Sequence, residues 1–525
     1  MKKRLLALFL LACVFNPITA GGIDISLELT QTPYKWGGKN GNSFEYIIGE
    51  TADEYLALRA SYFFTYDLKI ARYDKATMNL LEVKPLFPKD YIRKGGIRPT
   101  YSWGINQFKN RIYFLFGYKD QSKNNISVYH QKMNDDGSMD GDPDKLIEAP
   151  FVNGSAGWFG GVYSFDSTKF LSVYEVPTKN KENQKYSFHV YNIEDMSLVF
   201  ERDVELPFMD KDVELVRYDV DNEGSVYGLM KIKEKKQKGD PQGNYKFKIY
   251  TFTKESGDVG EYDFENTLDK DVYLNSIILL VKNNILYFSG FWGKKSSLNI
   301  SGVYSIRLNA KTGNELAKDF YEFSDEFIAE FYSDKEVDKA DKKGKDLELK
   351  RFVLDYFKIQ EDGSAIVVGE QFYIYTITIG RNTYTYYVHN DIIVTKIDPA
   401  GQILWSSKIP KKSQNQGSTG HLSYHFYQKD QDLYFIYYDH QDNFGLEDPK
   451  KYDRVPFFTK KMDLVCTKIN QDGEKEKALI YNYADVAWNQ LKVYPNTLQN
   501  INQSEIIGEG FVKGRQGVLT RFTAR

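Results

Sequence analysis

Two histidines, His421 and His425, stand four residues apart in the sequence. On a helix this spacing puts both imidazoles on one face, where they can bind a single metal ion. The residues around them have the pattern of a strand, however, and four extended residues separate the two side chains by roughly 13 Å. We therefore expect no metal ion to be shared by these histidines.

The sequence contains none of the common catalytic signatures. It has no His-Glu-x-x-His motif of zinc hydrolases and no glycine-rich phosphate loop. Residues 153–157 differ from a nucleophile elbow, because Asn153 stands where a glycine is needed. We therefore expect binding in preference to catalysis, and no cofactor.

Two acidic loops have enough carboxylates to bind calcium. In the first loop, Lys145 stands where a calcium loop needs its turn glycine. We interpret both as solvated acidic segments, with calcium sites as the alternative. The first contains Asp135, Asp136, Asp140, Asp142 and Asp144, and the second contains Asp439, Asp442, Glu447 and Asp448.

Carboxylate pairs are the remaining route to catalysis. Glycoside hydrolysis needs two carboxylates roughly 5–9 Å apart, and the fold sets that distance. Glu370 and Glu509 each follow a glycine in corresponding apolar segments. We interpret them as a feature of an internal repeat, and a hydrolase or lyase remains an alternative.

Aromatic residues are abundant, at 15% of the chain. Aromatic side chains favour strands, and at the mouth of a channel they can stack on sugar rings or contact peptide side chains. The alternative is that they pack between sheets. The candidate binding residues are Trp103, Trp158, Tyr373, Tyr375, Tyr384, Tyr386, His389, His421, Tyr424 and His425.

A weak internal repeat determines where these residues lie. Alternating apolar residues, a polar turn that usually contains glycine, and a second extended run recur along the chain, as in residues 464–467 before Asp472-Gly473. This pattern predicts hairpins, and each repeat becomes a four-stranded antiparallel unit. The second strands of successive units start at Glu54, Arg111, Lys169, Ser225, Ile285, Ala365, Asp432 and Glu505.

Such a series predicts an all-β fold, a β-propeller of eight four-stranded blades, with seven blades as the alternative. The last unit lacks its fourth strand, whereas an alternating segment at residues 23–29 has no place in the first unit. We expect this N-terminal strand to close the ring. A tandem of β-sandwiches is a further alternative, although no linker rich in proline or serine separates the units.

The connections differ between the two faces of such a ring. Turns that follow the first and third strands of a unit lie on one face and are short. The other face, which we call the long-loop face, receives the insertions at residues 233–244, 333–350, 372–390, 411–421 and 439–461. Binding residues concentrate on long loops, and the tyrosine-rich segment 372–390 is expected to form a hairpin that extends beyond the sixth unit.

Two segments carry a resemblance to known proteins. Residues 309–316, Asn-Ala-Lys-Thr-Gly-Asn-Glu-Leu, and residues 397–405, Ile-Asp-Pro-Ala-Gly-Gln-Ile-Leu-Trp, resemble the outer-strand repeat of quinoprotein-like (PQQ-repeat) and WD40-like propellers. Residues 390–411 resemble a segment of uncharacterised exported proteins of Gram-negative bacteria. The resemblance implies the fold. A quinone-dependent member would carry an adjacent cysteine pair, which this sequence lacks, and we expect no quinone.

Residues 1–20 have the features of an export signal. Lys2, Lys3 and Arg4 precede a short apolar run, and small Ala20 precedes Gly21. We expect cleavage there, which leaves residues 21–525 as one propeller domain. Lipoprotein processing at Cys13, with an outer-membrane anchor, is the alternative. No apolar run is long enough to span a bilayer.

Without this leader, 66 basic and 72 acidic residues give a net charge of −6. A mildly acidic surface is a poor match for nucleic acid. Cys466 lies in an apolar strand pattern and is expected in the core. We therefore expect a periplasmic or extracellular protein that binds a protein or polysaccharide partner through its long-loop face, with an envelope-anchored scaffold as a further alternative.

Overall fold

The structure is a computed structural model. It describes residues 23, 25–30, 34–35, 43–61, 67–87, 101–108, 111–120, 122–150, 157–178, 182–233, 245–254, 260–264, 272–294, 299–342, 347–417, 419–446, 448–455, 459–485, 490–512 and 516–524. The predicted leader, with Cys13, lies outside the described residues. None of the helices in the described part is long and apolar enough to cross a membrane.

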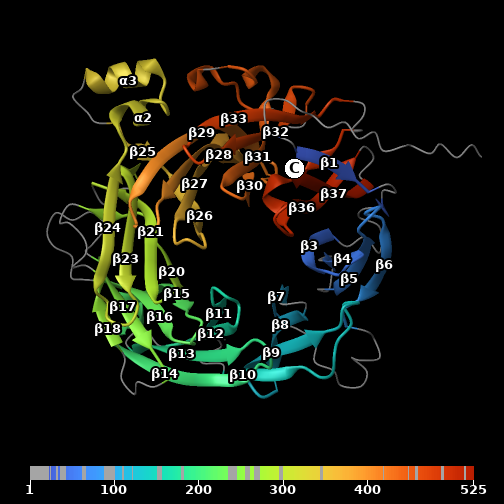
Figure 1. Cartoon of the computed structure of the whole chain (residues 1–525), viewed down its shortest axis with the longest axis vertical. Coiled ribbons are helices and arrows are strands. Elements are labelled where there is room, and N and C mark those ends of the chain that lie inside the picture. The colour runs from blue at the N-terminus through green and yellow to red at the C-terminus, as the bar shows by residue number, and fades with distance from the viewer. Residues whose placement is uncertain are drawn as a thin grey trace, which may run out of the picture.

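Eight antiparallel sheets of four or more strands are formed by the described residues, and they stand around a common centre (Figure 1). We number them in chain order. Sheet 1 contains β3 (Ser43–Glu50), β4 (Glu54–Ser61), β5 (Asp67–Asp74) and β6 (Leu80–Pro85). Sheet 2 contains β7 (Tyr101–Phe108), β8 (Arg111–Asp120), β9 (Asn125–Met133) and β10 (Asp144–Pro150). Sheet 3 contains β11 (Trp158–Tyr163), β12 (Lys169–Val176), β13 (Asn183–Asn192) and β14 (Leu198–Met209). Sheet 4 contains β15 (Val213–Val220), β16 (Val226–Lys233), β17 (Tyr245–Phe252) and β18 (Gly260–Asp263).

The second half of the chain continues the series. Sheet 5 contains β19 (Tyr273–Leu274), β20 (Ile278–Lys282), β21 (Ile285–Gly293), β23 (Gly302–Asn309) and β24 (Glu315–Glu322). Sheet 6 contains β26 (Phe352–Ile359), β27 (Ala365–Ile379), β28 (Asn382–Ile397) and β29 (Ile403–Gln416). Sheet 7 contains β30 (Tyr424–Lys429), β31 (Asp432–His440), β32 (Met462–Ile469) and β33 (Lys475–Asn482). Sheet 8 contains β34 (Lys492–Val493), β35 (Gln499–Asn500), β36 (Glu505–Val512), β37 (Gln516–Ala524), β1 (Ile25–Leu29) and β2 (Tyr34–Lys35).

The predicted propeller of four-stranded antiparallel units is confirmed. The second strands of the first and last units, β4 and β36, begin at Glu54 and Glu505, as the repeat predicted. The sheets surround a centre instead of packing in pairs, which argues against a tandem of sandwiches (Figure 1). In Figure 1 the first strand of each of sheets 1 to 7 lies nearest the centre of the ring, and we call the region that these strands surround the channel.

Strands from both ends of the chain meet in sheet 8. β1 pairs with β37 from Ile25 opposite Ala524 to Leu29 opposite Thr520. Ile23 and Ile25 are buried in a cluster that includes residues of sheets 7 and 8. β1 therefore occupies the fourth position of the last sheet, the place that the repeat left vacant.

The core lies between neighbouring sheets. One cluster joins Leu171 and Val173 of sheet 3 to Val226 and Met230 of sheet 4. Middle strands are covered on both faces, which is why β21 reads as a nearly continuous apolar run instead of an alternating one. Cys466 belongs to this core, and burial raises the pKa of its thiol to about 12, so the predicted core position is confirmed.

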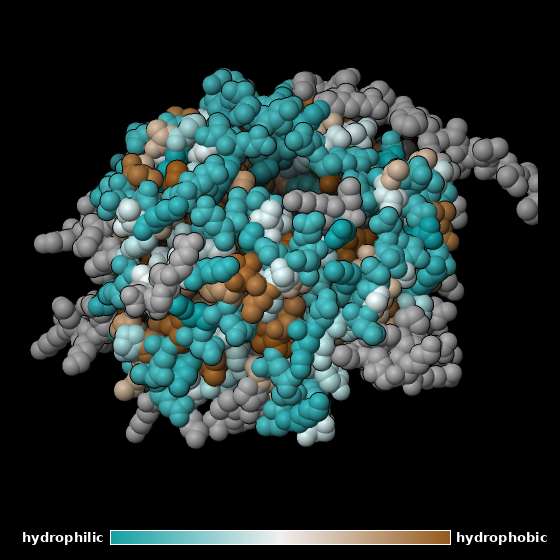
Figure 2. All heavy atoms as spheres, turned by 60° about the horizontal axis from the view of Figure 1, so that its bottom comes forward, coloured by the Kyte–Doolittle hydropathy of each residue, from teal (hydrophilic) through white to brown (hydrophobic). Residues whose placement is uncertain are grey.

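The described turns between the first and second strands of the sheets are short, whereas residues 234–244 of one predicted insertion lie outside the described residues. Gly363 and Gly473 close short turns with φ of 87° and 83°, a conformation that favours glycine. The insertion after β24 contains α2 (Asp325–Ala329), α3 (Asp334–Asp341) and β25 (Leu349–Lys350), which pairs with β22 (Asn299–Ile300). The surface in Figure 2 is largely hydrophilic, with apolar side chains in small separate patches.

Candidate functional site

The two longest strands of the described residues, β27 and β28, form a hairpin on the long-loop face. These strands have 15 and 16 residues, whereas β31 and β32 of sheet 7 have 9 and 8. After a register shift, their ladder continues from Phe372 opposite His389 to Ile379 opposite Asn382. β29 pairs with β28 as far as Gln416. The predicted hairpin is therefore present, as a three-stranded extension of sheet 6 that we call the hairpin extension.

One face of the hairpin extension carries a ladder of tyrosines, because alternate side chains share a face of a strand. The rings of Tyr375 and Tyr386 stack with centroids 5.2 Å apart, and the Tyr373 ring follows at 6.3 Å from that of Tyr375. Nε2 of Gln414 donates to the Tyr375 hydroxyl over 2.5 Å. The Arg351 guanidinium lies 4.9 Å from the centre of the Tyr373 ring. These contacts hold the tyrosines in fixed orientations.

Three isoleucines near the tip of the hairpin extension are solvent-exposed, beside the exposed Arg381 of the turn. Ile377 and Ile379 are 42% and 66% exposed on the tyrosine face, and Ile374 is 48% exposed on the opposite face. Tyr384 lies directly across from Ile377 and is half-buried. Exposed β-branched residues at a hairpin tip gain nothing from the fold of their own chain, and such surfaces mark interaction sites.

A buried charged network lies at the base of the hairpin extension. Lys411 is fully buried, and its Nζ lies 2.9 Å from Oε1 of the buried Glu370. Oε2 of Glu370 lies 2.5 Å from Nδ1 of His389 and accepts a hydrogen bond of 2.9 Å from the Ser423 hydroxyl. Lys411 also donates to the carbonyl oxygens of His389, over 2.7 Å, and Leu422. The network joins sheet 6 to the segment that leads into sheet 7.

Burial and partner charges oppose each other in this network. Burial alone would raise the pKa of the Glu370 carboxyl, but Lys411 and His389 outweigh it and leave the pKa below its ordinary value. Burial lowers the pKa of Lys411, and Glu370 opposes that shift. Glu370 is therefore an ionised carboxylate whose oxygens are already engaged.

A second carboxylate stands on the channel wall beside this network. β26 has a β-bulge between Leu354 and Tyr356, and bulges change the direction of a side chain. The side chain of Asp355, the extra residue, accepts a hydrogen bond of 2.8 Å from the Tyr424 hydroxyl. Desolvation by the surrounding wall and the charge of Glu370 raise the pKa of Asp355 to about 7. Asp355 remains accessible to solvent, so it can exchange a proton near neutral pH.

The predicted histidines are placed close to this region but contact different groups. His421 and His425 are 2% and 6% exposed. Burial lowers the pKa of each to about 4, and at His421 the charges of Lys411 and His389 add to the shift. Nε2 of His425 lies 2.7 Å from Oδ1 of Asn500 in sheet 8. Both imidazoles are therefore neutral at pH 7.

Two adjoining hollows of about 430 and 270 Å³ lie along the channel and share Ile47, Asn500 and Ile501. The side-chain oxygen of Gln107 accepts from the backbone N–H of Glu50 over 2.7 Å, and that of Gln499 accepts from Ile47 N–H over 2.6 Å. Innermost strands leave backbone groups unpaired at their free edges. We therefore interpret these amides as links between neighbouring sheets.

The two candidate tryptophans lie on innermost strands. Trp103 is in β7, and its side chain lies outside the described residues. Trp158 begins β11, is 48% exposed and contacts the Tyr218 ring edge-on with centroids 6.0 Å apart. Opposite it stands Glu175, whose pKa is raised by burial and by the charges of Asp210 and Glu214.

In the first acidic loop, Asp136 accepts hydrogen bonds from the backbone N–H and the hydroxyl of Ser138, and carboxylates of the second loop also have local partners. Asp442 pairs with Lys461 at 3.0 Å, and Asp448 accepts a hydrogen bond from the backbone of Lys450. His440, Asp442 and Asp453 bring possible metal-ligand atoms within 4.8 Å of one another. Nδ1 of His440 already accepts a hydrogen bond from the backbone N–H of Asp442. Glu447 lies outside the described residues.

The structure thus brings His389, His421 and Tyr424 together around a charged centre that the sequence analysis missed. Lys411 and Asp355 were not singled out, because a lone charged residue in a strand pattern usually faces solvent. The one available signal was Glu370 after a glycine, a feature that Glu509 shares in sheet 8.

No protein-family model and no curated protein matches this sequence. Similar solved structures include the β-propeller domain of the Trilobed protease from Pyrococcus furiosus, with 11% identity, coverage of 84% of this chain and 100% of that chain, and a TM-score of 0.33. The WD40 domain of SCAP from fission yeast has 9% identity, coverage of 95% of this chain and 94% of that chain, and a TM-score of 0.38. The quinohemoprotein alcohol dehydrogenase from Comamonas testosteroni has 8% identity, coverage of 94% of this chain and 76% of that chain, and a TM-score of 0.37. β-Propellers of the WD40 and quinoprotein types are thus among the structural neighbours of this chain, as the repeat motifs indicated.

Proposed function

We propose that this protein is an exported, non-catalytic β-propeller that binds a protein or glycan partner through its long-loop face, with the hairpin extension as the main contact. The observation that carries the proposal is an apolar, aromatic surface held rigid above the ring. The exposed isoleucines favour a protein, because sugar recognition uses aromatic faces and polar groups, whereas aliphatic side chains fill apolar pockets of a partner.

The buried network supports this function mechanically. Binding loses less entropy when the contacting side chains are already ordered. The stacked tyrosines and the ion pair of Glu370 with Lys411 fix the hairpin extension relative to sheets 6 and 7. The platform therefore requires little ordering when a partner binds.

A binding screen with matched variants tests the proposal. The full chain is screened against envelope proteins, peptides and glycans, and each hit is repeated with the double variant Ile377→Thr, Ile379→Thr, which keeps the β-branched shape. Leu81→Thr, at a 53% exposed leucine of the outer strand β6, is the control. The double variant should weaken binding at least tenfold and the control should not. Equal binding by both variants would refute the role of the hairpin extension.

A second candidate function, a hydrolase or lyase acting on glycans or peptides, is favoured by one observation. Asp355 is solvent-accessible, carries a pKa of about 7 and is hydrogen-bonded to Tyr424. Glu370 is the nearest candidate for a second carboxylate, but it is buried and its oxygens are engaged. Product analysis of the screened glycans and peptides decides: turnover that Asp355→Asn abolishes would establish catalysis.

The proposed export of the protein, and its alternative of a membrane anchor, depend on how the leader at residues 1–20 is processed. The full chain is expressed in a Gram-negative host, and mass spectrometry of the mature protein distinguishes the cleaved form from the lipid-modified form. A chain that begins at Gly21 supports export by signal peptidase cleavage, whereas a lipid-modified Cys13 supports an anchored scaffold. An unprocessed chain in the cytoplasm would contradict both.

A further inference from the structure

One face of sheet 3 carries an interrupted aromatic row. β11 and β12 place three pairs side by side: Phe159 opposite Tyr174, Gly161 opposite Ser172, and Tyr163 opposite Phe170. The outer pairs are in ring contact, with centroids 4.4 and 5.0 Å apart. The middle pair has small side chains, which leaves a gap that the Phe170 ring fills in part.

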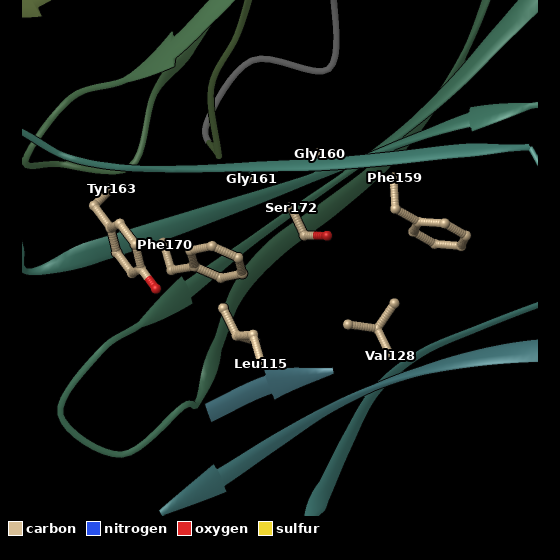
Figure 3. A pocket seen from close by; sticks show the side chains of 8 residues that line it. All are labelled: Leu115, Val128, Phe159, Gly160, Gly161, Tyr163, Phe170 and Ser172. Atoms are coloured by element: carbon tan, nitrogen blue, oxygen red, sulfur yellow. The ribbon is translucent and has the colours of Figure 1, made fainter. Parts of the chain in front are cut away.

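Sheet 2 closes this gap on the opposite side. A cavity of about 130 Å³ remains between the two sheets, and Leu115 of β8 and Val128 of β9 form its far wall. Figure 3 shows the Ser172 side chain between the aromatic groups, with Leu115 and Val128 facing them across the cavity. Because Gly161 lies on the innermost strand and is exposed, the cavity reaches the channel side of the ring.

The position of Phe170 requires a glycine at residue 161. A Cβ atom added to Gly161 would lie 2.7 Å from two ring carbons of Phe170, closer than such atoms approach each other. No side chain can therefore enter from this position while Phe170 keeps its place. The Phe170 ring therefore packs over Gly161 and forms one side of the remaining cavity.

Two residues that line the cavity carry a hydroxyl, Ser172 and Tyr163. Ser172 is 3% exposed, and no described residue forms a hydrogen bond with its side chain. The Ser172 hydroxyl is directed at the cavity (Figure 3), and it can donate to or accept from a ligand there.

We infer that this cavity is a binding site for a small monoaromatic molecule with one hydrogen-bonding group, of the phenol class. A cavity of about 150 Å³ lined by apolar side chains holds a benzene molecule, so this volume suits a single ring. The ring lies between the aromatic pairs, Leu115 and Val128 cover it, and its hydroxyl pairs with Ser172. The site lies away from the hairpin extension and is independent of the proposed partner binding.

Phenol and benzene are the probes, and the full chain is titrated with each by calorimetry and by ligand-observed NMR. Phenol should bind more tightly than benzene. Ser172→Ala should weaken phenol about three- to tenfold, the effect of one net hydrogen bond, and leave benzene within twofold. Ser305→Ala, at a buried serine of β23, is the control and should change neither affinity.

A second experiment fills the cavity with a larger side chain. Val128→Phe should abolish the binding of both probes, and the milder Val128→Leu should weaken both, with folding checked by circular dichroism. If Val128→Phe does not fold, Val128→Leu and xenon diffraction from crystals of the unchanged protein keep the test decisive. Absence of binding by both probes, or binding that survives in a folded Val128→Phe protein, would overturn the site. Equal phenol affinity in the unchanged protein and Ser172→Ala would overturn the role of the hydroxyl.

Discussion

The buried pair of Lys411 and Glu370 offers a sharp test of how sheets 6 and 7 are held together. Lys411→Met keeps the length of the side chain and removes its charge. The ionised Glu370 would then keep contacts to His389 and Ser423 only, in a site where both members of the pair are at most 2% exposed. We expect the free energy of unfolding to fall substantially.

The expected loss of stability follows from the burial of Lys411 and Glu370. Removing one member of a buried ion pair typically costs about 3–5 kcal/mol, because the other charge stays desolvated. Two contacts of Glu370 survive, so we expect about 3 kcal/mol, at the lower end. Glu370→Leu should cost a similar amount, since Lys411 would face carbonyl oxygens alone. The double variant should cost about 2 kcal/mol less than the sum of the two single variants.

Urea unfolding at pH 7 measures these values, provided that the dependence on urea concentration is the same for all variants. Lys123→Met, at a lysine whose side chain is 71% exposed, is the matched control and should leave stability unchanged. A cost below about 1 kcal/mol for Lys411→Met, in the range of surface pairs, or additive effects of the two substitutions, would refute the reasoning.

Further predictions concern the ends of the chain, the channel and its rim. Deletion of residues 21–29 should lower stability by several kcal/mol, because it removes β1 from sheet 8 together with the buried Ile23 and Ile25; thermal unfolding at an unchanged temperature would show that β1 is dispensable. The pKa of His425 is about 4 in the folded protein and about 6.5 in the unfolded chain, so the unfolded chain binds the proton first and stability is lost as pH falls from about 6.5 to 4. In His425→Gln, urea unfolding across that pH range should show a smaller loss of stability. An identical dependence of stability on pH would contradict the prediction. Asp355→Asn should remove a group that titrates near pH 7, visible as a lost carboxyl resonance in NMR titrations, and persistence of that resonance would exclude Asp355 as its source. Trp158→Ala should cost far less than the roughly 3–5 kcal/mol of a fully buried tryptophan, since Trp158 is 48% exposed; a cost in that range would make it a packing residue.

Local sequence patterns determined the strands and most turns of this protein. Period-2 alternation and glycine pairs act over a few residues, so β4 begins at the predicted Glu54 and Gly473 lies in the predicted turn. The repeat of these units then indicated the propeller and assigned β1 to the last sheet. The hairpin extension was likewise predicted, because two extended runs rich in tyrosine lie on either side of Gly380-Arg381 in residues 372–390.

Only the tertiary structure decided which side chains meet. Lys411 and Glu370 are 41 residues apart in the chain, and Tyr424 and Asp355 are 69 residues apart. Their contacts depend on how neighbouring sheets pack and on a bulge that redirects Asp355, and neither follows from the alternation of single strands. The cavity at Gly161 arises in the same way. A glycine opposite a serine is unremarkable in two strands, and it becomes a binding space only when a second sheet covers it.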